Sequence, residues 1–349
     1  MSDPKIERLL SNSELSTSQL RDVREAIYSS PYLVNVMKVA IDQQRLRHIG
    51  ISDNPNESGS YDSVRGAIEL NADVFEKKSQ KARFDEIVGV VGHETGHALM
   101  ARSAELYTSE FAYSVEHAIR EASRAGDLGV DISQFAKFYV DSSRKNEALA
   151  ELVSMNSLAS RVSVQQGRFD KEDFLRRADA GTSCIENGLL KSGINVNSDG
   201  YQLPGHGIDS PQIEKVAICH FDNGANTLGR KGTSEYPDYY AAGALGIAAD
   251  IWRDYSRGTT LPMPRLALDV DLMKTSKQRM EDAGVDLGQP GRSFDFIAIS
   301  GGQRRIESIT QHGGEPSHRR PDALPDKPQL ANNPAHQDFA TFDRIHQWA

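Results

Sequence analysis

One short segment of the chain carries the pattern that is most specific for chemistry, His93-Glu94-Thr95-Gly96-His97. Residues four apart lie on the same face of a helix, so the imidazoles of His93 and His97 can bind one zinc ion. A catalytic zinc ion takes three protein ligands, keeps its fourth position for water and lowers the pKa of that water toward ~7. Glu94 follows the first histidine and can accept the proton of this water. The pattern therefore predicts a zinc-dependent hydrolase with Glu94 as the general base.

The third ligand is expected in the later segment Asn146-Glu147-Ala148-Leu149-Ala150-Glu151, which lies in a predicted helix. Glu147 and Glu151 are again four apart, and two like charges at this spacing are unfavourable unless a cation lies nearby. A zinc ion bound by one carboxylate, with a ligating histidine held by the other, would remove that penalty. We predict Glu147 as the ligand and Glu151 as the group that orients His93. The alternative is that both are solvated surface carboxylates.

Three glycines, Gly89, Gly92 and Gly96, recur at spacings of three and four around the first motif. Each glycine costs about 0.5–1 kcal/mol inside a helix relative to alanine. Three such costs on one face indicate a neighbour that must approach closely. We expect this neighbour to be the helix that carries the third ligand.

Apolar periodicity predicts the elements that position these residues. Residues 3–47 are helical with two polar breaks, and short strands at 48–52 and 64–71 form a hairpin across the turn-rich segment 53–60. Helices are predicted from Phe84, over 106–125, 132–162, 170–187 and 241–255. The glycine-rich stretch 188–236 is predicted to be loop.

The composition excludes several functional classes. The 349-residue chain has a net charge of -9, which does not suit nucleic-acid binding because phosphate contacts need clustered Lys and Arg. The longest apolar stretch, 239–252, is too short and too polar for a membrane span. The first residues lack the basic and apolar segments of a secretory signal, so synthesis in the cytoplasm is expected. Cys184 and Cys219 are expected to be buried free thiols, and a disulfide is plausible only in an oxidising compartment.

The two motifs together resemble the gluzincin class of metallopeptidases, whose pattern is H-E-x-x-H followed by N-E-x-x-x-D. The resemblance covers residues 64–162 and implies that His93, His97 and Glu147 are ligands and that Glu94 is the base. Glu151 stands where the class has Asp, which leaves open which of the two carboxylates binds the metal. The implied fold is α+β and mostly helical, with a small antiparallel sheet packed on the two ligand-bearing helices. The strand at 64–71 would be the sheet edge on which an extended peptide lies.

Gluzincin-like enzymes also supply a His or Tyr from a later segment to stabilise the oxyanion of the intermediate. We assign this role to His206, which has a glycine on each side, and to Tyr239. The open alternatives are His220, Tyr236 and Tyr240.

The end of the chain differs in composition from the rest. Residues 301–330 contain four prolines and are predicted to be a linker that follows a catalytic domain over 1–300. Within 331–349, the segment 332–342 resembles the opening of the C-terminal domain of type IV secretion effectors in Xanthomonas-like bacteria, N/D-P-x-H-P-D-H-x-L-F/Y. Gln337, Phe339 and Thr341 depart from that pattern. The alternative is an ordinary amphipathic tail.

This second resemblance implies a partner and a destination. The tail would be recognised by the coupling ATPase of a type IV secretion system, and the enzyme would reach the periplasm of a rival bacterium. Peptide crosslinks of peptidoglycan, or envelope proteins, would be the substrate, and a cognate immunity protein would protect the producing cell. The alternatives are a cytoplasmic zinc protease and a non-catalytic binding protein with a structural zinc ion.

Overall fold

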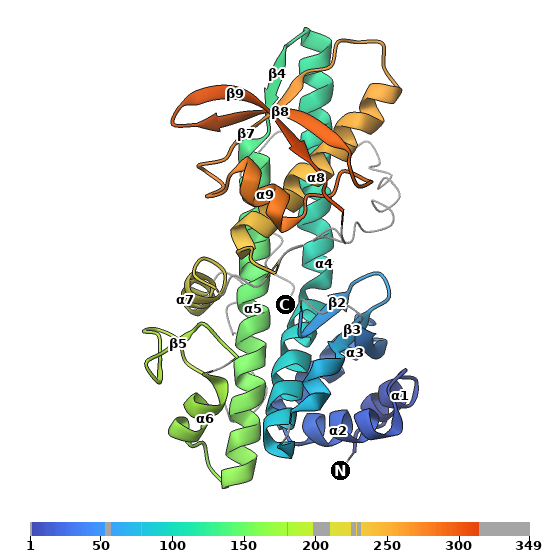
Figure 1. Cartoon of the computed structure of the whole chain (residues 1–349). Helices are drawn as coiled ribbons and strands as arrows, with labels where there is room; N and C mark the ends of the chain where they lie inside the picture. The colour runs from blue at the N-terminus through green and yellow to red at the C-terminus, as the bar shows by residue number, and fades with distance from the viewer. Residues whose placement is uncertain are drawn as a thin grey trace.

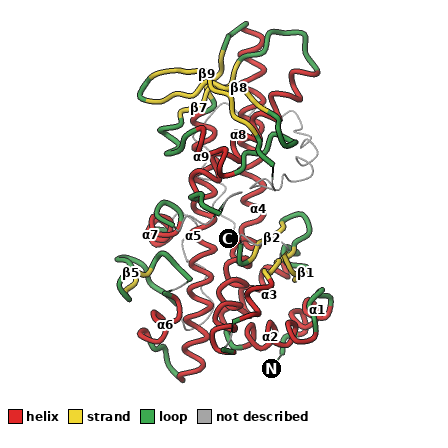
Figure 2. Tube along the Cα trace, viewed as in Figure 1, coloured by secondary structure: helices red, strands yellow, loops and turns green. Residues whose placement is uncertain are grey.

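The computed structural model describes residues 2–52, 57–77, 79–179, 181–197, 210–224, 228 and 232–313. The fold is α+β and mostly helical, as predicted. The two larger sheets are mixed, so the small antiparallel sheet that the resemblance implied is wrong in its strand directions. Two long helices, α4 (Gln80–Ala125) and α5 (Ser133–Gln166), lie side by side and run through the length of the molecule (Figure 1). The other elements pack around this pair (Figure 2). Within the described part of the chain, no helix combines the length and apolar character that a membrane span requires.

Helix α4 begins and ends where local chemistry favours it. The Ser79 side chain accepts from the backbone N–H of Ala82, and the helix ends at Gly126, which adopts the left-handed conformation (φ 75°). The predicted helices from Phe84 and over 106–125 are one continuous helix, because neither proline nor glycine interrupts residues 97–106. The motif His93–His97 therefore lies well inside a long rigid element.

The glycines of α4 allow α5 to approach, as predicted. A Cβ atom added at Gly96 would lie 2.5 Å from Ala150 Cα, and one at Gly92 would lie 2.9 Å from Ser157 Oγ. At Gly89 the corresponding distance to Ser154 Oγ is 3.6 Å, which is ordinary contact. The close approach therefore centres on Gly92 and Gly96, and α5 is the helix that carries Glu147 and Glu151.

The N-terminal part of the chain packs on one end of α4. It comprises α1 (Pro4–Ser11), α2 (Thr17–Tyr28), α3 (Pro31–Asp42), β1 (His48–Ser52), β2 (Gly59–Asp62), β3 (Ala67–Asn71) and the short 3-10 helix η1 (Ala72–Glu76). The sheet order is β1-β3-β2, in which β1 and β3 are parallel and β2 and β3 are antiparallel. The predicted hairpin of 48–52 with 64–71 is therefore wrong, and the strand at 67–71 is central, not an edge. The hairpin is β2–β3, and β2 was missed because Gly-Ser-Tyr-Asp shows no apolar alternation.

A third group of elements packs on α5. It comprises α6 (Lys171–Ala178), β5 (Ile185–Glu186), β6 (Leu189–Leu190) and α7 (Pro211–His220). The predicted helix over 170–187 thus ends at Ala178, and the stretch predicted as loop over 188–236 contains α7. Cys184 and Cys219 form a disulfide with a Cα–Cα distance of 5.0 Å, so the predicted free thiols are wrong. A separation of 35 residues gave no spacing signal for this pair.

The opposite end of the α4–α5 pair carries a second sheet that the apolar pattern did not reveal. It is built from β4 (Gly129–Asp131), β7 (Arg265–Asp269), β8 (Ser293–Ser300) and β9 (Gln303–Thr310), in that order. Helices α8 (Tyr236–Arg257) and α9 (Lys277–Ala283) pack with it, and α8 contains the predicted helix over 241–255. Strand β9 pairs with β8 along its whole length, from Gln303 opposite Ser300 to Thr310 opposite Ser293. The predicted linker therefore cannot begin at 301. The remaining linker, 314–330, and the tail, 331–349, lie outside the described residues.

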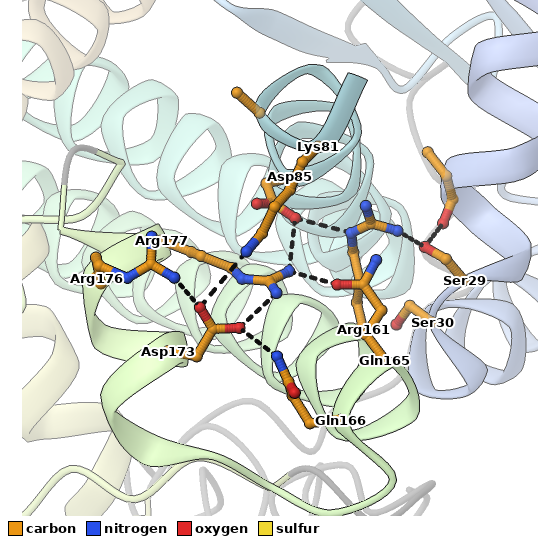
Figure 3. Close-up of polar contacts among 12 residues, drawn as sticks. Ser29, Ser30, Lys81, Asp85, Arg161, Gln165, Gln166, Asp173, Arg176 and Arg177 are labelled. Atoms are coloured by element: carbon orange, nitrogen blue, oxygen red, sulfur yellow. Dashed lines mark hydrogen bonds and ion pairs between the residues drawn. The ribbon is translucent and has the colours of Figure 1, made fainter. Parts of the chain in front are cut away.

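A buried ionic cluster ties the ends of α4, α5 and α6 to the end of α2 (Figure 3). Asp85 accepts from Arg161 at 2.8 Å and from Arg177 at 3.3 Å, and both arginine side chains are 3% exposed. Arg161 also donates to Ser29, and Arg177 donates to Asp173. Buried charges of this kind are tolerated only when they are paired, so the cluster fixes the relative position of the helices.

Candidate metal centre

Four predicted residues converge between the two long helices. His93 and His97 come from α4, and Glu147 and Glu151 come from α5. The pairs are each spaced by four residues, so both present their side chains on the face where the helices meet. Both carboxylates are buried, with Glu147 5% and Glu151 3% exposed. Such burial of two carboxylates is costly unless cations or donors compensate it.

Three atoms form a compact set of possible ligands. His93 Nε2 lies 3.1 Å from His97 Nε2, and Glu147 Oε2 lies 3.5 Å from each of these nitrogens. Zinc–ligand bonds of 2.0–2.1 Å in a tetrahedral arrangement place neighbouring ligand atoms roughly 3.3–3.4 Å apart. The three separations therefore fit one tetrahedral metal ion. This set can bind a metal, and its donors are two imidazoles and one carboxylate.

The far atom of the Glu147 carboxylate is held by a residue from α8. Tyr240 Oη donates to Glu147 Oε1 at 2.5 Å, so Oε2 alone faces the two imidazoles. His97 is held in a similar way, because its Nδ1 lies 3.3 Å from Asn146 Oδ1. Asn146 Nδ2 in turn donates to Tyr107 Oη at 3.3 Å. Contacts of this kind orient metal ligands and set their protonation.

Glu151 lies between two imidazoles. Its Oε2 atom is 3.6 Å from His93 Nδ1 and 3.6 Å from His220 Nδ1. His93, Glu151 and His220 also form a second group of atoms that could hold a metal ion. His93 Nε2, however, belongs to the first group, and one imidazole that serves two ions would have to lose both ring protons. These contacts suit a carboxylate that orients His93, which is the role predicted for Glu151, better than they suit a metal ligand.

His220 brings the end of α7 to the centre. Its Nε2 atom lies 3.1 Å from Tyr236 Oη and 3.9 Å from Glu147 Oε2. Tyr236 and Tyr240 are four apart in the first turns of α8, so both point toward the same cluster. His220 is not part of the ligand set of His93, His97 and Glu147. Among the described residues, that set has three protein ligands.

The charges of the cluster are strongly coupled. Burial alone would lower the pKa of His93, but the Glu147 and Glu151 carboxylates outweigh it and raise this pKa well above 6.5. Burial alone would raise the pKa of Glu147, but His97 and His93 hold it well below its usual value of 4.5. Burial also lowers the pKa of His97, but Glu147 outweighs it and raises this pKa, so a protonated imidazole beside an ionised carboxylate is favoured. A metal cation that binds here displaces this proton and takes over the stabilisation of the carboxylate.

Glu94 differs from the other carboxylates of the cluster. It is 6% exposed, and burial raises its pKa while His93 and His97 oppose the increase. Strand β2 passes directly beside it: a Cβ atom added at Gly59 would lie 2.4 Å from Val90 Cγ1 and 3.6 Å from Glu94 Cγ. The edge strand of the N-terminal sheet therefore adjoins the residue predicted as general base.

The remaining predicted residues differ in outcome. His206 lies outside the described residues. Tyr239 is on α8, with its ring 5.5 Å from that of Tyr240, but the neighbouring Tyr240 and Tyr236 make the described hydrogen bonds to the cluster. The Tyr236-x-x-x-Tyr240 spacing was the one sequence signal that could have selected these two tyrosines.

Comparison of the chain with protein-family models, with curated proteins and with solved structures gives no match.

Proposed function

We propose that the protein is a zinc-dependent metallopeptidase of the gluzincin type. One observation carries the proposal: His93 Nε2, His97 Nε2 and Glu147 Oε2 lie 3.1–3.5 Å apart, with Glu94 next to the first ligand on the same helix. Two imidazoles with one carboxylate are a ligand set of catalytic zinc sites in peptidases. Zinc, when bound, supplies Lewis acidity toward water and toward the substrate carbonyl.

The residues of the chain would perform the remaining steps. Glu94 accepts the proton of the attacking water and delivers it to the leaving amine, and its burial keeps its pKa above that of an exposed glutamate. Asn146 and Glu151 orient His97 and His93 through their Nδ1 atoms, and Tyr240 turns one oxygen of Glu147 toward the ligand set. The second carboxylate thus has the orienting role that the class gives to Asp.

The His220–Tyr236 pair supports oxyanion stabilisation. The two side chains are hydrogen-bonded at 3.1 Å, and both lie beside the ligand set without belonging to it. A donor at this position can bind the charge that develops on the carbonyl oxygen. We therefore assign this role to His220 and Tyr236 together; Tyr239 and His206 remain predictions.

The edge strand β2 supports an extended peptide as substrate. Among the described residues, β3 pairs with β2 on one side only, so the other edge of β2 could pair with an added strand. A peptide paired there would run past Gly59 and beside Glu94. Extended segments of envelope proteins have this form, and the short peptide crosslinks of peptidoglycan are the second candidate substrate.

The number of ligands separates catalysis from a structural role. A structural zinc site is closed by four protein ligands, whereas a catalytic site leaves one position open. The ligand set has three members among the described residues. This count supports the enzyme and disfavours a binding protein in which zinc only stabilises the fold.

The compartment is inferred from the disulfide and from the tail. A disulfide persists in oxidising spaces such as the bacterial periplasm and is rare in the cytoplasm. The Cys184–Cys219 bond therefore favours an envelope toxin over a cytoplasmic protease. Delivery by a type IV secretion system, recognition of the tail by the coupling ATPase and protection by an immunity protein follow from the resemblance of residues 332–342.

The substitution Glu94→Gln tests the enzyme directly. It keeps the shape of the side chain and all three ligands, so zinc content should stay at one per chain while hydrolysis of labelled casein and of peptidoglycan sacculi falls by about a thousandfold or more. Glu110→Gln, an exposed change on the same helix, is the control and should retain both properties. Loss of zinc together with activity, or full activity in Glu94→Gln, would contradict the assignment.

The compartment is tested by directing the chain to the periplasm of a susceptible bacterial host. The wild type should lyse the cells from the periplasm and not from the cytoplasm, and Glu94→Gln should lyse them from neither. Lysis from the cytoplasm alone would favour the cytoplasmic protease.

A further inference from the structure

The end of α7 is held by a covalent bond one residue away from the cluster. Cys219 immediately precedes His220, the last residue of α7, and its sulfur is bonded to that of Cys184. Ser183 Oγ also donates to the Cys219 carbonyl at 2.8 Å. The segment that contains Ser183 and Cys184 is thus bonded to the helix turn from which the His220 imidazole projects.

The other end of this bond lies in the segment before β5, which packs in the same apolar cluster as α5. Cys184 precedes β5, and its carbonyl accepts from the backbone N–H of Lys191 at 3.0 Å. Both half-cystines are buried, at 0% and 1% exposure, in an apolar cluster that includes residues of α5, α6 and α7. The bond therefore ties the residue before His220 to the segment before β5, within the apolar cluster that also includes the carboxylate-bearing helix α5.

The position of His220 matters because three of its contacts converge on the cluster. Nδ1 lies 3.6 Å from Glu151 Oε2, while Nε2 lies 3.1 Å from Tyr236 Oη and 3.9 Å from Glu147 Oε2. The hydrogen bond to Tyr236 would be lost if the helix end moved by more than about 1 Å, because hydrogen bonds weaken steeply beyond their normal length. The same movement would lengthen the two contacts with the carboxylates. The ligand set of His93, His97 and Glu147 comes from α4 and α5 and includes no residue of α7.

A second restraint remains when the disulfide is absent. Arg144 of α5 donates to Glu214 in the first turn of α7 at 2.7 and 2.9 Å, and to Asp222 beyond its end at 2.8 and 2.7 Å. These ion pairs keep α7 against α5 in either redox state. They reach Asp222 through long side chains, however, and fix the backbone of His220 less tightly than a bond to the adjacent residue.

We propose that the Cys184–Cys219 disulfide positions His220, so that the metal site forms in either redox state but full hydrolytic activity requires the oxidised chain. The inference rests on the proposed function of His220. The two thiols lose two protons and two electrons as the S–S bond forms, and the disulfide of an oxidant such as oxidised glutathione is reduced to two thiols. Because the sulfurs are buried, the bond is set by the compartment in which the chain folds. An enzyme folded in a reducing cytoplasm would bind zinc and remain weakly active.

The first test compares wild type with Cys184→Ala/Cys219→Ala by hydrogen–deuterium exchange and zinc content. Exchange should become faster in residues 211–222 and stay unchanged in residues 146–158, and zinc should remain at one per chain. Phe174→Leu, which trims the same apolar cluster from α6, is the control and should not affect residues 211–222 selectively. Unchanged exchange in residues 211–222 would overturn the proposal, whether or not the chain proves to be a peptidase.

The second test asks whether the disulfide acts through His220. Loss of the bond should lower kcat/KM about tenfold in the wild type, because misplacement of a catalytic group by about 1 Å costs one to two orders of magnitude. In a His220→Ala background the same loss should change kcat/KM less than twofold. Equal losses in both backgrounds would overturn the positioning role. Full activity in His220→Ala would refute the assigned role of His220 and the positioning argument together. Absence of hydrolysis in every zinc-loaded form would instead count against the proposed function.

Discussion

The hydrogen bond from Tyr240 to Glu147 makes a quantitative prediction about zinc affinity. Tyr240→Phe removes only the hydroxyl that donates to Glu147 Oε1 at 2.5 Å. Contacts that orient a metal ligand contribute roughly 10–100-fold to metal affinity, or about 1.4–2.8 kcal/mol. A hydrogen bond to a charged, buried acceptor contributes a similar amount, about 1.5–3 kcal/mol. Tyr240→Phe should therefore raise the Kd for zinc by roughly one to two orders of magnitude.

The assay is a competition titration with a chromophoric zinc chelator, together with a thermal melt of the zinc-free protein to verify folding. Tyr255→Phe is the matched control, because Tyr255 lies on the same helix about 22 Å further along its axis. The control should bind zinc as the wild type does. An unchanged or lower Kd in Tyr240→Phe, or an equal loss in Tyr255→Phe, would refute the reasoning.

Three further perturbations test the scaffold and the charges of the site. Gly96→Ala should destabilise the zinc-free protein by about 1–3 kcal/mol, because the added methyl group would collide with α5. Gly89→Ala should be neutral or stabilise it by up to about 1 kcal/mol. Denaturant unfolding measures both effects. Equal effects at the two glycines would contradict the packing argument. Asp85→Asn should cost about 3–5 kcal/mol in the same experiment, since the buried Arg161 loses its charged partner; a change below about 1 kcal/mol would show that the cluster is dispensable. Burial lowers the pKa values of His93 and His97, but the neighbouring carboxylates outweigh it and raise both above 6.5. Zinc binds unprotonated imidazoles, so zinc affinity should rise with pH by roughly tenfold or more per unit; a flat profile between about pH 6 and 8 would contradict the raised pKa values.

The ligand-bearing part of the site was predictable because its signals are local. Spacings of four place His93 with His97 and Glu147 with Glu151 on single helix faces, and the glycines of α4 indicated the close approach of the second helix. Each of these inferences needs only the geometry of one helix. The coarse α+β class followed in the same way from long periodic segments.

The rest of the site depends on contacts between distant segments. His220 and Tyr240 lie 73 and 93 residues after Glu147. The spacing of Tyr236 and Tyr240 relates these two tyrosines to each other, but no local pattern ties them or His220 to the cluster. The register of β1 with β3 is likewise non-local, because the polar strand β2 that separates them along the chain does not alternate. The Cys184–Cys219 bond was missed because two distant cysteines predict a disulfide only when the compartment is known to be oxidising, and no local pattern in the sequence shows this.

Bound zinc in the purified chain tests the central claim most directly. Elemental analysis should find one zinc ion per chain in the wild type and in Glu151→Ala, with weaker retention in the latter, and none in Glu147→Ala. This result would establish His93, His97 and Glu147 as the ligand set. A wild type that binds no zinc, or a Glu147→Ala variant that retains it fully, would contradict the account.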